Sequence, residues 1–156
     1  MDRGYIDGFD GLKAAPGPCG KQREVLMKIL VGYDGSNSAR EALQLALKHA
    51  KAFGAGVDVV TSMVKGNEAQ REGIKNAEGG LSYAEGLFKE HGIDCSTHLL
   101  IRGLTPGEDI VQFAEEKNPD EIVIGVKRRS KVSKLIMGST AQYVILKASC
   151  PVVTVK

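Results

Sequence analysis

Residues 125–140 read GVKRRSKVSKLIMGST, and the prediction of the fold starts from this stretch. It follows an apolar run at 121–124 that is typical of a strand, and it precedes an apolar-periodic helix at 141–147. Such a loop exposes unpaired backbone N–H groups at the positive end of the helix dipole. It also holds only basic charges, at Lys127, Arg128, Arg129, Lys131 and Lys134. The stretch therefore predicts an anion site, although a merely solvated basic loop has the same composition.

Outward from this loop, short apolar runs alternate with amphipathic segments along the chain. Strands are predicted at 28–33, 57–62, 94–101, 121–124 and 151–155. A helix with a capping-box pattern at Ser38 and Glu41 follows the first strand, and one with Thr105, Pro106 and Glu108 at its start follows the third. The second helix, within 68–91, contains four glycines and is expected to begin late, after a mobile lead-in from 64 to about 75.

Five strands that alternate with four helices predict an α/β three-layer sandwich with a parallel five-stranded sheet. In the order 3-2-1-4-5, strands one and four are neighbours where the strand order reverses, and ligands bind at the carboxyl ends of strands at that point. Asp34 follows strand one and the basic loop follows strand four. The sequence thus predicts a carboxylate and a phosphate cradle in one crevice.

Length and composition fit a single folded unit. The 156 residues are 42% hydrophobic and 26% charged with a net charge of +2, and no apolar run approaches the roughly 18 residues of a membrane helix. We expect a glycine-rich flexible leader at 1–26, a domain at 27–156 and a cytoplasmic location. The three cysteines and three histidines are scattered, without the spacing of a metal or redox motif.

Other α/β proteins can be tested on their motifs. The first strand is not followed by G-x-G-x-x-G, and no G-x4-G-K-[ST] is present, which argues against a dinucleotide-binding fold and a P-loop NTPase. A receiver domain would place an acceptor aspartate after strand three, where this chain has Ile101, Arg102 and Gly103.

These residues resemble the universal stress protein family. The run Val31 to Ser36, VGYDGS, is similar to the first-strand signature of the family, and Gly103 to its glycine after strand three. Gly125 with Gly138 and Ser139 is similar to its G-x2-G-x9-G-[ST] loop. The closing CPVV at 150–153 is also similar, so the resemblance spans 27–156 and implies the adenine nucleotide alpha hydrolase-like fold.

The resemblance implies ATP or a related adenine nucleotide such as AMP in the crevice, with Mg²⁺ possible on the nucleotide. Asp34 would contact the ribose or that Mg²⁺, the backbone at Ser62 the adenine edge, and Gly125 the ribose and phosphate. Gly138, Ser139 and Thr140 would donate to the phosphates. The residues implied to bind the nucleotide are Asp34, Gly35, Ser36, Ser62, Gly103, Gly125, Arg128, Gly138, Ser139 and Thr140.

Arg128 departs from the loop motif, which has its second glycine there. Its side chain either clamps the phosphates or crowds the pocket so that binding is lost. We expect retained binding and little or no catalysis, because the crevice offers no histidine base and no paired carboxylates. The alternative is a nucleotide-free homodimeric interaction module. RNA binding is not favoured, because aromatic residues do not interleave with the cations.

The last strand, Pro151 to Val155, predicts the oligomeric state. Its valines on a terminal edge would leave an apolar margin with unpaired backbone groups, which a second copy can cover. The family resemblance also implies a homodimer through this strand.

Overall fold

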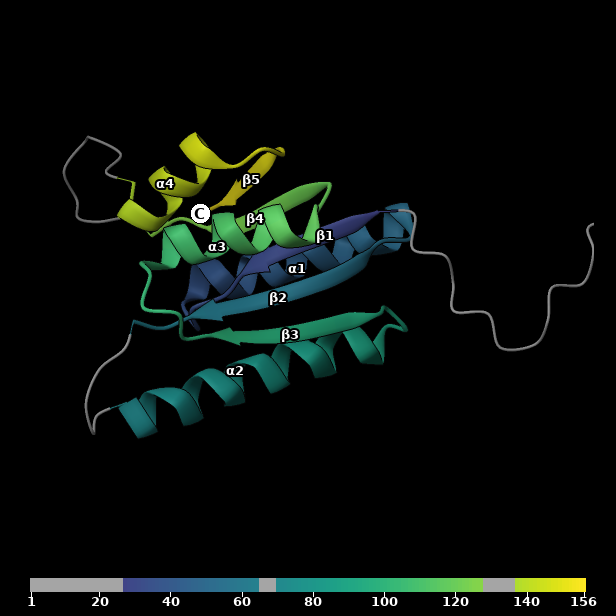
Figure 1. Ribbon diagram of the computed structural model, residues 1–156. Coiled ribbons are helices and arrows are strands. Elements are labelled where there is room, and N and C mark those ends of the chain that lie inside the picture. Colours follow the sequence, from purple (N-terminus) through teal and green to yellow (C-terminus); the bar gives the residue numbers. More distant parts are fainter. Residues whose placement is uncertain (1–26, 65–69, 128–136) are drawn as a thin grey trace, which may run out of the picture.

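The computed structural model describes residues 27–64, 70–127 and 137–156, except for the side chain of Gln70. Strands and helices alternate along these residues (Figure 1). They are β1 (Lys28–Gly32), α1 (Asn37–Phe53), β2 (Gly56–Ser62), α2 (Gln70–Glu90), β3 (Cys95–Leu100), α3 (Pro106–Lys117), β4 (Glu121–Gly125), α4 (Ser139–Lys147) and β5 (Val152–Val155). All pairings are parallel in the order β3-β2-β1-β4-β5, which confirms the predicted fold.

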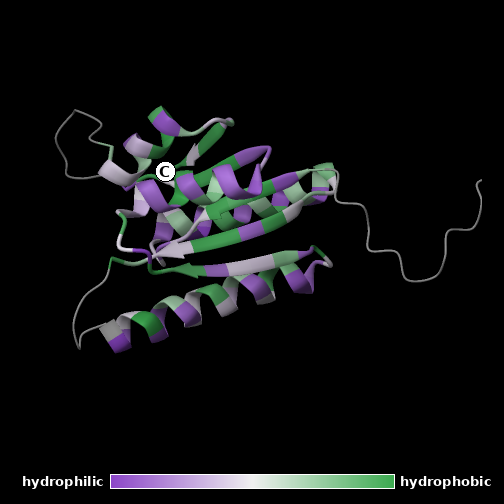
Figure 2. Cartoon of the chain, viewed as in Figure 1, coloured by the Kyte–Doolittle hydropathy of each residue, from purple (hydrophilic) through white to green (hydrophobic). Residues whose placement is uncertain are grey.

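Helices cover both faces of the sheet, α1 and α2 on one and α3 and α4 on the other (Figure 1). Side chains of β1 alternate between the two layers, so that Ile29 and Val31 pack with α1 while Leu30 packs with α3. The central strands are therefore apolar on both sides. Figure 2 colours most of their residues as hydrophobic. This double coverage explains the continuous apolar run in the first strand.

The switch point lies between β1 and β4. Strand β1 pairs with β2 on one side and with β4 on the other, and Gly32 stands opposite Ile124 in the register. The segments that follow β1 and β4 therefore leave the sheet side by side at its carboxyl edge. This placement confirms the juxtaposition that the sequence predicted.

The helix starts were predicted correctly in one case and wrongly in another. In α3, Thr105 caps the helix and Glu108 completes the capping box. In α1, the cap is Ser36, whose Oγ accepts from the backbone N–H of Ala39 at 3.2 Å, so the predicted cap at Ser38 is wrong. The helix therefore begins two residues earlier than predicted, directly after the turn in which the N–H of Ser36 donates to Oδ1 of Asp34.

Helix α2 also begins earlier than expected, at Gln70 rather than after residue 75. Two of its four glycines pack closely: a Cβ on Gly73 would lie 2.9 Å from Cε of Met63, and one on Gly80 would lie 2.8 Å from Cε1 of Tyr33. Close packing against these side chains offsets the poor helix propensity of glycine. The part of the predicted lead-in at 65–69 lies outside the described residues, as do the leader and the loop 128–136.

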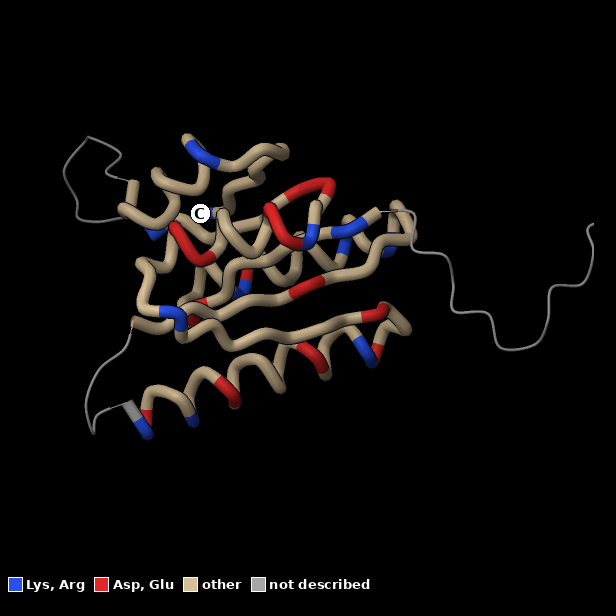
Figure 3. The backbone as a smooth tube through the Cα atoms, in the orientation of Figure 1, with Lys and Arg blue, Asp and Glu red and all other residues tan. Residues whose placement is uncertain are grey.

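Charged residues of both signs are spread over the helices and their connecting loops, and the central strands carry few of them (Figure 3). No helix within the described residues combines the length and apolar character that crossing a membrane requires.

Candidate functional site

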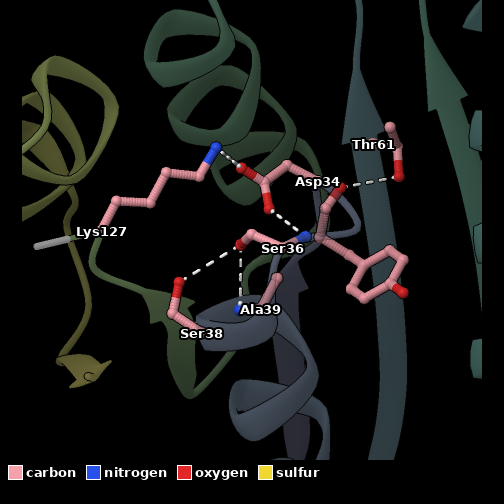
Figure 4. A network of polar contacts seen from close by, with 7 residues as sticks. Asp34, Ser36, Ser38, Ala39, Thr61 and Lys127 are labelled. Carbon is pink, nitrogen blue, oxygen red and sulfur yellow. Dashed lines mark hydrogen bonds and ion pairs between the residues drawn. The ribbon is translucent and has the colours of Figure 1, made fainter.

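The loops after β1 and β4 meet through an ion pair. Oδ2 of Asp34 lies 2.7 Å from Nζ of Lys127, which follows β4 (Figure 4). The partners are 93 residues apart in the sequence, and only the β1–β4 pairing brings them together. Both side chains are more than half exposed, at 52% and 60%, so water screens the attraction. The pair thus marks the mouth of a crevice and contributes little to stability.

Hydrogen bonds order the turn that carries Asp34 (Figure 4). The backbone N–H of Ser36 donates to Oδ1 of Asp34 at 3.0 Å, and the hydroxyls of Ser36 and Ser38 are hydrogen-bonded at 3.2 Å. Partial burial alone would raise the pKa of Asp34, but the hydrogen bonds from Lys127 and Ser36 outweigh it and hold that pKa below its usual value. Asp34 is therefore an ionised acceptor at neutral pH.

A second contact fixes the level of the turn against the sheet. The hydroxyl of Thr61 donates to the backbone carbonyl of Tyr33 at 2.8 Å (Figure 4). The backbone N–H of Tyr33 donates to the carbonyl of Val60 at 2.8 Å. The end of β2 therefore holds the residues that precede Asp34.

A cavity of about 310 Å³ opens at the switch point. This volume lies at the small end of the range for ligand pockets. Its walls come from the ends of β1, β2 and β4 and from the first turns of α1, α3 and α4. The lining residues are Gly32, Tyr33, Asp34, Ala39, Val60, Ser62, Pro106, Ile110, Ile124, Gly125, Lys127, Gly138, Ser139, Thr140 and Ala141.

The N-terminus of α4 forms one wall of this cavity. Gly138 is the N-cap, and no side chain of the described residues caps the helix. A Cβ built on Gly138 would have no described atom within 4 Å, so space is open beside the first turn. The N–H groups of this turn carry the partial positive charge of the helix. With Lys127 nearby, this wall is suited to bind an anion.

Gly125 serves packing as well as lining the cavity. A Cβ at this position would lie 2.5 Å from the backbone carbon of Ser38 and 2.6 Å from the backbone nitrogen of Ala39. Both are fixed backbone atoms at the start of α1. Only glycine lets the end of β4 approach α1 this closely.

The structure brings most of the predicted site residues together. Six of them line the cavity: Asp34, Ser62, Gly125, Gly138, Ser139 and Thr140. Gly35 lines a neighbouring cavity of about 280 Å³ beneath α2, Ser36 caps α1, and Gly103 forms a turn with φ of 80° and lines neither cavity. Arg128 lies outside the described residues, so the role proposed for its side chain stays a prediction.

Sequence reasoning missed two polar features of the site. The sequence analysis treated Lys127 only as one cation of the basic loop. Its position two residues after β4, opposite the segment that follows β1, could have indicated the ion pair with Asp34. The bond between the hydroxyl of Ser62 and Oδ2 of Asp109 had no such signal. Asp109 follows the capping glutamate in the first turn of α3, and its sequence position does not reveal its burial.

The chemistry of the described lining residues is that of binding. They include no histidine or cysteine, and Asp34 is the only carboxylate among them. Within the described parts of the chain, no three His, Cys, Asp or Glu residues gather closely enough to hold a metal ion. The site therefore offers an anion-binding helix end, one carboxylate, one lysine and apolar walls.

A parallel sheet of this order with a cavity at its switch point defines a doubly wound α/β protein with a ligand site at the carboxyl edge of the sheet. Residues 26–156 match the universal stress protein family. The chain belongs to this family.

The chain has relatives among curated proteins and solved structures. It is 33% identical over 140 residues to a universal stress protein of Methanocaldococcus jannaschii, which covers 83% of this chain and 81% of the relative. The structure of a universal stress protein from Archaeoglobus fulgidus superposes with a TM-score of 0.73 at 38% identity, covering 85% of this chain and 95% of that one. A universal stress protein structure from the same organism, in complex with dAMP, superposes with a TM-score of 0.71 at 37% identity. It covers 85% of this chain and 99% of that one.

Proposed function

We propose that this protein is a regulatory protein of the cytoplasmic stress response that binds an adenine nucleotide, ATP or AMP, with little or no catalysis. The observation that carries the proposal is the cavity at the switch point, where Asp34 and Lys127 lie across its mouth. One wall is the N-terminus of α4, which no side chain of the described residues caps. The Archaeoglobus fulgidus relative in complex with dAMP supports the choice of an adenine nucleotide.

In this proposal, the phosphates lie at the first turn of α4. The backbone N–H groups and hydroxyls of Ser139 and Thr140 donate to them, and Gly138 leaves room for their approach. Lys127 exchanges part of its contact with Asp34 for a phosphate oxygen. A dianionic phosphate group attracts the ammonium more strongly than one screened carboxylate does.

The nucleoside lies toward β2. Asp34 accepts hydrogen bonds from the ribose, and with ATP it can face a phosphate-bound Mg²⁺. The backbone at Ser62 meets the adenine edge, and Val60, Pro106 and Ile110 offer apolar surface to the faces of the purine. Gly125 keeps the backbone of the β4 end close to the ribose.

Slow or absent turnover follows from the same lining. Hydrolysis of ATP needs a group that positions or activates water and charges that stabilise the transition state. The described lining supplies one carboxylate, which already bonds Lys127 and the turn N–H of Ser36. We therefore assign the bound nucleotide a regulatory role.

Binding is tested by titrating purified protein with AMP, and with ATP in the presence and absence of Mg²⁺, in a calorimeter. The chain has no tryptophan and four tyrosines, so co-purified nucleotide also stands out as excess absorbance at 260 nm. We expect saturable binding in the micromolar range. No heat with any of these nucleotides from protein free of co-purified ligand would contradict the proposal. Restoration of binding by Arg128→Gly would locate the cause at the departure from the loop motif.

The second candidate is a nucleotide-free interaction module that forms a homodimer through β5. This strand is the edge of the sheet, and Val152, Val153 and Val155 remain partly exposed. The carbonyls of Pro151 and Val155 bond β4, so by alternation the backbone of Thr154 points away from the sheet toward a possible partner. A dimer in solution that gives no heat of binding in the nucleotide titrations would favour this second function.

A further inference from the structure

Asp109 is fully buried, with 0% of its surface exposed, although it is a carboxylate. Oδ2 accepts a hydrogen bond from Oγ of Ser62 at 2.5 Å, whereas Oδ1 has no partner among the described residues. The other buried carboxylate of the described chain, Glu121, contacts His49 at 2.6 Å and keeps 8% exposure. Of these two carboxylates, Asp109 is thus the one with a buried oxygen that has no described partner. Such an unpaired acceptor costs folding free energy, so its position calls for an explanation.

The hydrogen bond to Asp109 determines what Ser62 can offer a ligand. Oγ of Ser62 donates to Oδ2 of Asp109, and a serine hydroxyl has a single proton to donate. The bond to Asp109 therefore uses the only proton of Ser62, and the hydroxyl oxygen keeps acceptor capacity alone.

Ser62 stands at the end of the cavity remote from the phosphate-binding wall. It closes β2, which lies two strands from β4 and therefore about 10 Å across the sheet. It lines both the main cavity and the neighbouring one beneath α2. With phosphates at α4, the edge of a purine reaches this end.

We propose that the Ser62–Asp109 pair selects purines with an amino group at position 6 over purines with a carbonyl group there. The proposal rests on the proposed nucleotide site and names its specificity. The hydroxyl of Ser62, with its proton held by Asp109, accepts from the 6-amino group of adenine. The 6-carbonyl of hypoxanthine or guanine is itself an acceptor, so it finds no donor at Ser62.

The test compares the affinities for AMP and for inosine monophosphate, which differ at position 6 and share ribose and phosphate. Titrations use wild type, Asp109→Ala, Ser62→Ala and the control Glu115→Ala. Glu115 lies on the same helix but is exposed, so its substitution controls for a change in α3. Asp109 acts through Ser62, so it is a positioning residue. A merely structural role would lower both affinities together and leave their ratio unchanged.

Wild type and Glu115→Ala are expected to bind AMP about tenfold or more tightly than inosine monophosphate, because a site with a committed acceptor rejects a ligand that lacks the donor. In Asp109→Ala the hydroxyl can turn its proton to the ligand, and the ratio should fall to about threefold or less. Ser62→Ala should lower it likewise, and it decides alone if Asp109→Ala does not fold. A wild-type ratio near one, or variants that keep the wild-type ratio, would overturn this inference and leave nucleotide binding intact. Wild type that binds neither nucleotide would overturn both proposals.

Discussion

Gly125 and Gly138 belong to the same sequence motif, but the structure predicts opposite outcomes for their substitution by alanine. The Cβ of Gly125→Ala would lie 2.5 Å from the backbone carbon of Ser38, about 0.9 Å inside the 3.4 Å at which ordinary contact begins. The atoms that it would meet belong to the backbone of Ser38 and Ala39, so no rotamer change relieves the overlap. The end of β4 and the first turn of α1 must separate, which costs about 3 kcal/mol of unfolding free energy.

Gly138→Ala has no such conflict. No described atom lies within 4 Å of its Cβ, and φ of −62° is ordinary for alanine. Alanine is a poorer N-cap than glycine, which destabilises the variant by about 0.5–1 kcal/mol. Alanine also makes the unfolded chain less flexible than glycine does, which stabilises the fold by about 0.4–1 kcal/mol. The two effects nearly cancel, and we expect a change of less than about 0.5 kcal/mol.

Urea unfolding followed by circular dichroism measures both values, because the chain has no tryptophan to report by fluorescence. Wild type and both variants are compared at one protein concentration, since binding of a second copy would shift the apparent stability. A loss of about 3 kcal/mol corresponds to a fall of roughly 10 °C in Tm for a domain of this size. Equal losses for the two variants, or a larger loss for Gly138→Ala, would refute the assignment of Gly125 to packing.

Three further predictions concern charge and the sheet edge. Ser139→Glu should stabilise the fold by about 0.3–1 kcal/mol through the dipole of α4 but weaken AMP binding about tenfold or more. The neutral control Ser139→Gln should leave stability unchanged and weaken binding less than the glutamate does, because it removes only the hydroxyl donor. A glutamate variant that binds AMP as tightly as the glutamine variant in calorimetry would place the phosphates elsewhere. Because its folded pKa lies below the unfolded value, Asp34 stabilises the fold above about pH 4 and loses this contribution as the pH falls through the folded pKa. The stability gap between wild type and Asp34→Asn should therefore stay below about 1 kcal/mol at pH 7 and close in acid; a gap independent of pH would contradict the ion pair with Lys127. Thr154→Pro removes an outward N–H of β5 and should convert a dimer into a monomer in sedimentation at micromolar concentration, and an unchanged dimer would exclude pairing through this edge.

Much of the fold could be predicted because its signals are local. Apolar runs covered on both faces, the capping box at Thr105 and the alternation of strands with helices each depend on neighbours in the chain. Parallel pairing and the handedness of crossovers then leave few topologies, and the predicted order is the observed one. The local signal failed at Ser38, because a capping-box spacing cannot show that Ser36 already caps the helix.

The sequence by itself therefore determined the layers, the strand order and the meeting of the segments after β1 and β4, since periodicity and chain connectivity fix these. Only the tertiary structure decided which side chains pair across that crevice. Lys127 pairs with Asp34, and Ser62 donates a hydrogen bond to Asp109, over separations of 93 and 47 residues. Such contacts depend on how closely strands and helices approach one another in space. The pattern of residues along one segment gives no information about that distance.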